Sequence, residues 1–239
     1  SNKEYALRQF DQPIENKRVV LVVAFDFPPC KSAGVQRTLK LVDYWSSMGW
    51  QPVVLTVNKE AHIALDEEQQ IPESVTPFVF RASALNSAKD LAFKGKHLEI
   101  SKVPDKWWTW AISAIPLGKK LLAQFKPDVI FSTYPIPTAH YIAYKLHKQS
   151  KIPWIADYRD PVQCRYDASV QQYSSVVKWI ESKSVTCSSG VTFTTSAAKR
   201  LYETLYPDQP KDKFNVIANG FDEAVFNDIC LPEKQLAKF

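Results

Sequence analysis

A group of charged residues directly follows an apolar run in the middle of the chain. Trp154-Ile155-Ala156 has the character of a buried strand, and in Asp157-Tyr158-Arg159-Asp160, which comes next, two carboxylates flank a guanidinium. Carboxylates accept protons, and a guanidinium binds anions. Charges that leave a buried strand must be either paired with each other or solvated in a cleft. The segment therefore has two interpretations: a functional cleft, or a structural Asp–Arg pair that braces the strand end.

Two further segments, residues 26–34 and 134–140, combine proline with polar side chains and also follow apolar runs. Ordinary turn chemistry accounts for most loops of this composition. Their position after predicted strands nevertheless makes them candidates for ligand binding, together with residues 157–161.

The hydrophobic pattern predicts the elements that would position these segments. Residues 19–25 form a continuous apolar run typical of a strand buried on both faces, and apolar residues at helical spacing follow over 35–45. The alternation continues, with strands predicted at 52–57, 75–80, 128–133, 154–156, 190–195 and 214–218, and helices at 117–125, 137–146, 170–184 and 197–206. This order indicates an α/β fold with a doubly wound, mostly parallel sheet, in which ligands bind beyond the carboxyl ends of the strands.

The spacing of particular residue types excludes several classes of site. No two of the six glycines lie within a few residues of each other, so the chain has no G-x-G-x-x-G turn, Walker A loop or G-x-S-x-G elbow. The four cysteines and four histidines show no zinc-ligand spacing, so we expect no metal site, and we expect free thiols in a reducing compartment. No run of about 20 apolar residues predicts a membrane span. A formal net charge of +5 with scattered lysines does not predict nucleic-acid binding.

One basic segment rich in tryptophan does not fit the alternation of strands and helices. Its members are Lys94, Lys96, Lys102, Lys106, Trp107, Trp108 and Trp110. Lysine beside tryptophan suits an anionic membrane surface. The alternative is a long surface excursion whose tryptophans fold back into the core, since tryptophan side chains are usually well buried.

Five sequence motifs occur in a fixed order between residues 18 and 226. They are Phe27-Pro28-Pro29 with Ala33-Gly34-Val35-Gln36-Arg37-Thr38; Gly49-Trp50-Gln51-Pro52-Val53-Val54-Leu55; Phe131-Ser132-Thr133-Tyr134-Pro135 with Thr138-Ala139-His140; Ile152-Pro153-Trp154-Ile155-Ala156-Asp157-Tyr158-Arg159-Asp160-Pro161; and Ile217-Ala218-Asn219-Gly220-Phe221-Asp222. Together they resemble the N-terminal half of family-4 glycosyltransferases of the GT-B fold. Each motif is weak alone, and their common order makes the resemblance specific.

The resemblance implies a Rossmann-like domain that is one half of a two-domain GT-B enzyme. In such enzymes the first domain binds the acceptor and the second holds most of the nucleotide-sugar donor, and the sugar is transferred with retention of configuration and without a bound metal. We therefore expect residues 1–17 to be an N-terminal extension with a cloning remnant, 18–222 to form the acceptor-binding domain, and 223–239 to begin the linker to a C-terminal donor-binding domain. The chain alone is expected to be inactive and to need no cofactor beyond its nucleotide-sugar co-substrate.

The resemblance also suggests roles for the loops that follow the first and fourth strands. The loop with Ala33 and Gly34 would approach the donor phosphates, because a helix N-terminus favours negative charge. Arg37 would supply a cation there or, alternatively, be a solvated helix residue. Tyr134, Pro135 and Thr138 would shape the acceptor pocket. His140 would either reach the cleft or be a hydrogen-bonded structural residue.

This chain departs from the family pattern after the strand at residues 154–156. Many family members carry a catalytic-loop histidine there, and this chain has Asp157-Tyr158-Arg159-Asp160 instead. We expect Asp160 to face the acceptor, Asp157 to support it, and Arg159 to stabilise the departing phosphate.

These expectations combine into one leading function and two alternatives. The leading function is transfer of a sugar from a nucleotide-sugar to a lipid-linked or polysaccharide acceptor, in cell-envelope or exopolysaccharide synthesis, in the cytoplasm or at the inner face of the membrane. One alternative is a nucleotide-sugar epimerase of the same architecture. The other is a non-catalytic module that binds carbohydrate or a membrane surface.

Overall fold

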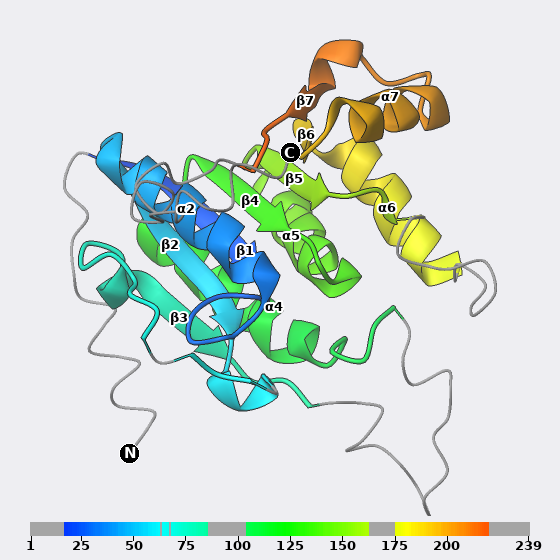
Figure 1. The fold of residues 1–239 in the computed structure, drawn as a ribbon. Helices are drawn as coiled ribbons and strands as arrows, with labels where there is room; N and C mark the ends of the chain where they lie inside the picture. Colours follow the sequence, from blue (N-terminus) through cyan, green and yellow to red (C-terminus); the bar gives the residue numbers. More distant parts are fainter. Residues whose placement is uncertain (1–16, 63, 67, 86–103, 163–174, 220–239) are drawn as a thin grey trace, which may run out of the picture.

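A parallel sheet of seven strands forms the centre of the chain in the computed structural model, which describes residues 17–62, 64–66, 68–85, 104–162 and 175–219 (Figure 1). The strands are β1 Arg18–Ala24, β2 Trp50–Val57, β3 Val79–Ala82, β4 Val129–Thr133, β5 Trp154–Arg159, β6 Gly190–Phe193 and β7 Phe214–Val216. They lie in the order β3-β2-β1-β4-β5-β6-β7. The direction of winding reverses between β1 and β4, which makes the carboxyl end of this strand pair a topological switch point.

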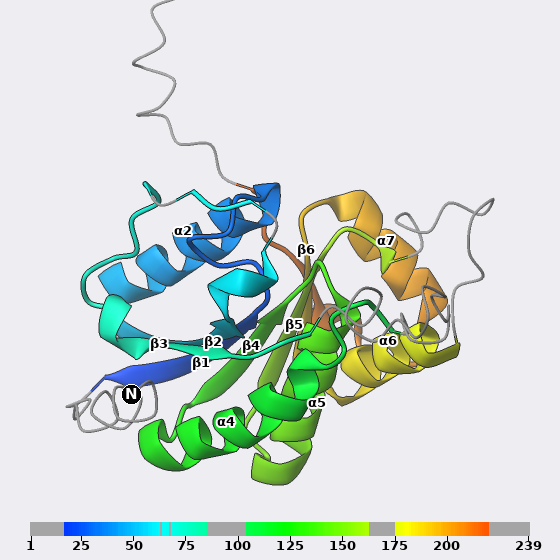
Figure 2. The same cartoon turned by 90° about the horizontal axis from the view of Figure 1, so that it is seen from below.

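Helices lie on both faces of the sheet, with α2 on one face and α4, α5 and α6 on the other (Figure 2). The helices are α2 Ala33–Ser47, α4 Trp110–Phe125, α5 Pro137–Ser150, α6 Ser175–Cys187 and α7 Ser196–Leu205, and the short 3-10 helices are η2 Lys59–Ala61, η3 Thr76–Phe78 and η6 Lys211–Lys213. Alternate residues of β1 enter different core clusters: Leu21 and Val23 join the cluster that includes α4–α7, and Val20 and Val22 join the one beside α2. This alternation explains the unbroken apolar run of β1, because both of its faces are buried.

The prediction of a doubly wound parallel sheet is confirmed, and the differences concern element boundaries. The strand expected at residues 75–80 begins at Val79, because the preceding residues form the 3-10 helix η3 with proline near its start. Strand β5 extends to Arg159 instead of ending at residue 156. The first residues of the helix expected at 170–184, and most of the segments expected to be an N-terminal extension and a linker, lie outside the described residues.

Two tryptophans of the tryptophan-rich segment lie in the core. Trp110 begins α4 and is fully buried, Trp107 is 8% exposed, and both pack against Phe25. The expectation that these two tryptophans contact a membrane is therefore wrong, and their core alternative is confirmed. Trp108 is half-buried and Lys106 is exposed, whereas Lys94, Lys96 and Lys102 lie outside the described residues. Among the described helices, none combines the length and the apolar character that crossing a bilayer requires.

Candidate functional site

Asp157 is the centre of a buried polar network near the carboxyl end of the sheet. Its carboxylate is fully buried and accepts hydrogen bonds from Arg37 Nε at 3.0 Å and Nη2 at 2.8 Å. It also accepts from Thr133 Oγ1 at 2.8 Å and Thr192 Oγ1 at 2.7 Å. These two threonines are the register partners of Asp157 on the neighbouring strands β4 and β6. Because register partners project to the same face of a sheet, the strands deliver both hydroxyls to the carboxylate.

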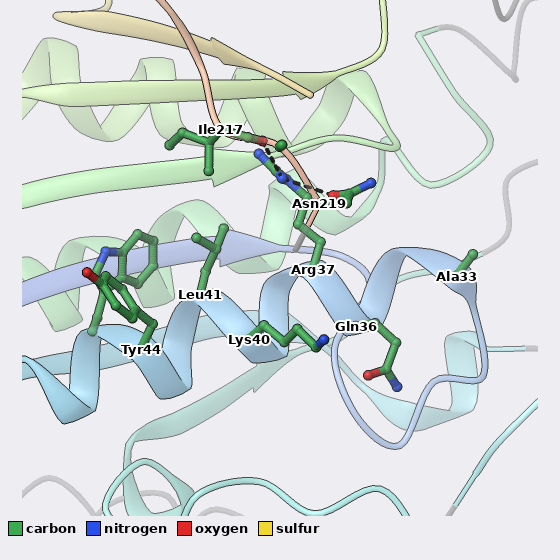
Figure 3. Close-up of a pocket in the computed structure, with 10 residues that line it drawn as sticks. Ala33, Gln36, Arg37, Lys40, Leu41, Tyr44, Ile217 and Asn219 are labelled. Atoms are coloured by element: carbon green, nitrogen blue, oxygen red, sulfur yellow. Dashed lines mark hydrogen bonds between the residues drawn. The ribbon is translucent and has the colours of Figure 1, made fainter. Parts of the chain in front are cut away.

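Arg37 joins this network to the last described residues of the chain. Its Nη1 atom donates to the Ile217 carbonyl oxygen at 2.8 Å and to Asn219 Oδ1 at 3.0 Å (Figure 3). The side chain is only 6% exposed, so the expectation of a solvated helix residue is wrong. Its charge is compensated by the bidentate contact with Asp157, which is the strongest geometry for such a pair.

A groove of about 580 Å³ runs along α2, and Arg37 is part of its lining. It is lined by Ala33, Gln36, Arg37, Lys40, Leu41, Tyr44, Trp45, Ile217, Ala218 and Asn219, which Figure 3 shows as sticks. Ala33 and Arg37, two of the residues predicted to bind substrate, therefore lie along one surface feature.

Arg159 ends β5 in an unusual backbone conformation. Its φ is +59°, and the Asp160 amide donates to the Tyr158 carbonyl oxygen at 2.6 Å, so the chain turns sharply there. Its guanidinium is buried and donates through Nε to Thr133 Oγ1 and through Nη2 to Thr38 Oγ1, each at 3.1 Å. A left-handed conformation in a residue other than glycine costs of order 1–3 kcal/mol and is characteristic of functional segments.

From the sequence we expected the segment Asp157-Tyr158-Arg159-Asp160 to be a loop after the strand. The structure shows instead that β5 continues to Arg159 and that Asp157, Tyr158 and Arg159 are buried. Asp157 and Arg159 point to the α2 side, where they contact Arg37 and Thr38, whereas Tyr158 lies in the core cluster on the opposite face. The physical reason is that β5 continues through the charged residues, so their side chains alternate across the sheet. Among these four residues only Asp160 is exposed. The catalytic roles of Asp157, Arg159 and Asp160 stay predictions.

Most of the residues after β4 that we expected to contact a substrate are buried. Tyr134 and His140 lie inside the core, whereas Pro135 is half-buried. The His140 ring lies 4.5 Å from that of Tyr158, and its Nδ1 atom is 2.7 Å from Ser132 Oγ. Burial lowers the pKa of His140 to about 3, with a smaller opposing effect of Asp157, so its imidazole is neutral near pH 7. This geometry favours the structural alternative for His140.

Thr138 is held by a carboxylate that sequence reasoning missed. Asp105 accepts from the Thr138 backbone amide at 3.0 Å and from its hydroxyl at 2.6 Å. Burial raises the pKa of Asp105, and these hydrogen bonds oppose the rise. Because Asp105 satisfies an amide of the first turn of α5, Thr138 anchors this helix start. The only available signal in the sequence was an isolated acidic residue beside the tryptophans.

Gly34 brings the start of α2 into close contact with two charged side chains. A Cβ atom at this position would lie 2.6 Å from Arg159 Nη1 and 2.6 Å from Asp26 Oδ2. Ser32, the N-cap residue, makes no side-chain capping bond, and its hydroxyl donates to Asp26 at 2.8 Å. The structure therefore brings Ala33, Gly34, Arg37, Asp157 and Arg159 together, whereas the side chains of Tyr134, Thr138 and His140 are buried outside this group.

Comparison with known proteins supports the assignment of the fold. The model of the family described as Glycosyltransferase Family 4 matches residues 34–225. Sucrose-phosphate synthase from Thermosynechococcus elongatus superposes with a TM-score of 0.62 at 14% identity, over 91% of this chain and 53% of that chain. HepE from Anabaena, in complex with UDP and glucose, gives a TM-score of 0.53 at 13% identity, over 93% and 50%. A UDP-N-acetylglucosamine 2-epimerase gives 0.50 at 11% identity, over 89% and 54%.

The chain spans about half the length of these solved structures. At such low identities the likeness shows a shared fold alone, so the similarity to an epimerase does not separately support epimerase activity. No curated protein matched the chain.

Proposed function

Because the chain belongs to Glycosyltransferase Family 4, we propose that it is the acceptor-binding domain of an enzyme that transfers a sugar from a nucleotide-sugar to a lipid-linked or polysaccharide acceptor. A second Rossmann-like domain would hold most of the donor. Transfer would retain the anomeric configuration and need no metal ion at the donor diphosphate. The observation that supports the acceptor-side assignment is the exposed Asp160, which follows the buried Arg37–Asp157 pair at the carboxyl end of β5.

The buried and exposed carboxylates of this segment suit different tasks. Asp157 is saturated by four hydrogen bonds and has no exposed surface, so it holds the strand ends together rather than contacting a substrate. Asp160 is exposed directly after the left-handed residue Arg159. A carboxylate presented in this way can accept the proton of an attacking hydroxyl or bind sugar hydroxyls.

The start of α2 suits the donor phosphates. Ala33, in the first turn of α2, is exposed, and the Arg159 guanidinium lies beside Gly34. The N-terminus of a helix attracts anions through its amide groups and its dipole. HepE, which shares this fold, was solved with UDP and glucose, which is consistent with a nucleotide-sugar as the donor.

An apolar groove supports a location at the cytoplasmic face of a membrane. It has a volume of about 390 Å³, and its lining includes Trp108, Ile112 and Trp179. Ile112 is 67% exposed and Trp179 is 43% exposed, and Lys106 is exposed nearby in sequence. Replacing Ile112 and Trp179 with Ser should weaken binding to anionic vesicles, whereas the same change at the exposed Tyr44 on α2 should not. Equal binding by both variants would contradict this location.

The proposed activity can be tested with the complete coding region that contains this chain. The protein would be incubated with a panel of nucleotide-sugars and lipid-linked or polysaccharide acceptors, without added divalent metal, and the products would be analysed. We expect nucleotide release that depends on an acceptor and a glycosylated product of retained configuration. An altered nucleotide-sugar formed without any acceptor would instead identify an epimerase. A coding region without a second Rossmann-like domain would contradict the proposal.

A further inference from the structure

Three potential metal ligands from two separate loops meet beyond the carboxyl end of β1. Asp26 and Cys30 belong to the loop between β1 and α2, and His62 follows the 3-10 helix after β2. Their ligand atoms all lie within 4.8 Å of one another, and no other such group of three occurs among the described residues. The spacing of cysteine and histidine along the chain gave no sign of this cluster, because its members come from the loops after two different strands, β1 and β2.

The backbone holds these two loops against each other. Cys30 forms an antiparallel bridge with Leu65. Next to it, the Lys31 amide donates to the Ala64 carbonyl oxygen at 2.9 Å, and the Asp66 amide donates to the Pro29 carbonyl oxygen at 2.7 Å. These contacts hold Cys30 beside residues 64–66, which follow His62 in the chain.

The polar atoms of this cluster are poorly satisfied by the described protein. The Asp26 carboxylate is buried, accepts one short hydrogen bond from Ser32 Oγ, and forms no ion pair among the described residues. Its contact with Cys30 Sγ is long, at 3.9 Å. His62 Nε2 is buried and has no hydrogen-bond partner in the described chain. Burial lowers the pKa of His62, Asp26 opposes this, and Arg81 adds a smaller lowering effect. The Arg81 guanidinium donates to two backbone carbonyl oxygens and not to Asp26.

Burying a carboxylate is costly unless it is paired, and a cation bound to Asp26 would lower that cost. A thiolate, an imidazole and a carboxylate together form a donor set that suits Zn²⁺. Tetrahedral Zn²⁺ with a sulfur and an oxygen ligand separates these two atoms by about 3.6 Å, close to the 3.9 Å between Cys30 Sγ and Asp26 Oδ1. Burial raises the pKa of the Cys30 thiol to about 11, with Asp26 adding to the rise, and a bound cation would act in the opposite direction.

We propose that Asp26, Cys30 and His62 bind one Zn²⁺ ion through Oδ1, Sγ and Nε2. Ser32 acts as a positioning residue, because its hydroxyl orients the second oxygen of Asp26, as outer hydrogen bonds commonly do for metal-bound carboxylates. The ion joins the loop after β1 to the loop after β2. Because Asp26 Oδ2 also lies against Gly34, the ion fixes the first turn of α2. This site is independent of which sugar or acceptor the enzyme uses.

The test is metal binding by the full chain, freed of any affinity tag and stripped of metal. Calorimetric titration with ZnCl₂ is expected to show a tight site with one equivalent of metal. Titration with Co²⁺ should give a thiolate-to-metal charge-transfer band, because Cys30 is a ligand. Both measurements use the unsubstituted chain, so the absence of a tight site or of the band would overturn the proposal even if every variant were unfolded.

Variants then identify the ligands. Cys30→Ser should abolish the charge-transfer band and weaken Zn²⁺ binding by at least about 100-fold, and His62→Ala should weaken it similarly. Cys187→Ser is the matched control, since Cys187 is the other free cysteine in the described chain. Zn²⁺ should raise the Tm of the unsubstituted chain and of the Cys187→Ser variant by mass action, and it should not do so in the two ligand variants. A band or a tight site that persists in Cys30→Ser would overturn the assignment.

Discussion

Replacing Arg37 with Met tests whether the Arg37–Asp157 pair holds the carboxyl end of the sheet together. Methionine keeps much of the length of the side chain and removes its charge and donors. The Asp157 carboxylate would lose its two shortest contacts with a cation, at 3.0 and 2.8 Å, and would keep the two threonine hydroxyls. The ion pair between Arg159 Nε and Asp157 Oδ2 would remain, but at 3.9 Å it is longer than the bidentate contact that is lost. The variant also loses the hydrogen bonds to Ile217 and Asn219.

The magnitude follows from burial. Side-chain exposure is 6% for Arg37 and zero for Asp157, so water cannot replace the missing partner. Removing one member of a buried ion pair costs about 3–5 kcal/mol. In a domain of this size that loss lowers Tm by roughly 10 °C. Urea denaturation followed by circular dichroism measures the free energy of unfolding directly.

The matched control is Gln36→Met, on the same helix turn but exposed, which should change stability by less than about 0.5 kcal/mol. Asp157→Asn combined with Arg37→Met completes a double-mutant cycle. We expect the double variant to lose less stability than the sum of the single variants, because Asp157→Asn removes the charge that Arg37→Met leaves without its bidentate partner. If Arg37→Met were as stable as Gln36→Met, or if the two changes were additive, the structural role of the pair would be refuted.

Two other predictions concern stability at separate places in the fold. Burial raises the pKa of Glu181 from 4.5 to about 7, although Tyr202 donates a hydrogen bond to its carboxylate. The folded state therefore binds this proton more tightly than the unfolded state does. The resulting contribution to the free energy of unfolding, about 3 kcal/mol, is complete below pH 4.5 and is lost as the pH rises to about 7. Glu181→Gln should abolish this pH dependence in denaturation experiments, whereas Glu203→Gln should preserve it. Gly34→Ala should destabilise the domain by about 1–3 kcal/mol net, because the new methyl group collides with Arg159 and Asp26, which outweighs the gain of about 1 kcal/mol in helix propensity. Stability equal to or above that of the unsubstituted chain would show that those side chains move aside freely.

The elements with the strongest local signals were predictable from the sequence. The apolar run of β1 identified a buried strand, and Pro137 identified the start of α5, since proline suits the first turn of a helix. The start of β3 was mispredicted because the apolar pattern from Val75 to Phe80 resembles a single strand. In the structure, Thr76–Phe78 form a 3-10 helix and the strand begins at Val79.

The candidate site was only partly predictable because its contacts depend on distant parts of the chain. The sequence showed that Asp157 and Arg159 carry opposite charges, but it did not show that Arg37 on α2 is the bidentate partner of Asp157. It also did not show that β5 continues through these residues and buries them. The proximity of Cys30 to His62 was not predicted for the same reason, since the loops after β1 and β2 contribute the two side chains.

The most direct test of the proposed acceptor site is the turnover number of the complete enzyme with Asp160→Asn, compared with Asp208→Asn, which changes an exposed carboxylate after α7. If Asp160 accepts a proton from the acceptor hydroxyl, kcat should fall by about 100-fold or more, with Tm unchanged, and Asp208→Asn should leave both values unchanged. Full transfer activity in the Asp160→Asn enzyme would contradict the assignment of this carboxylate to the acceptor.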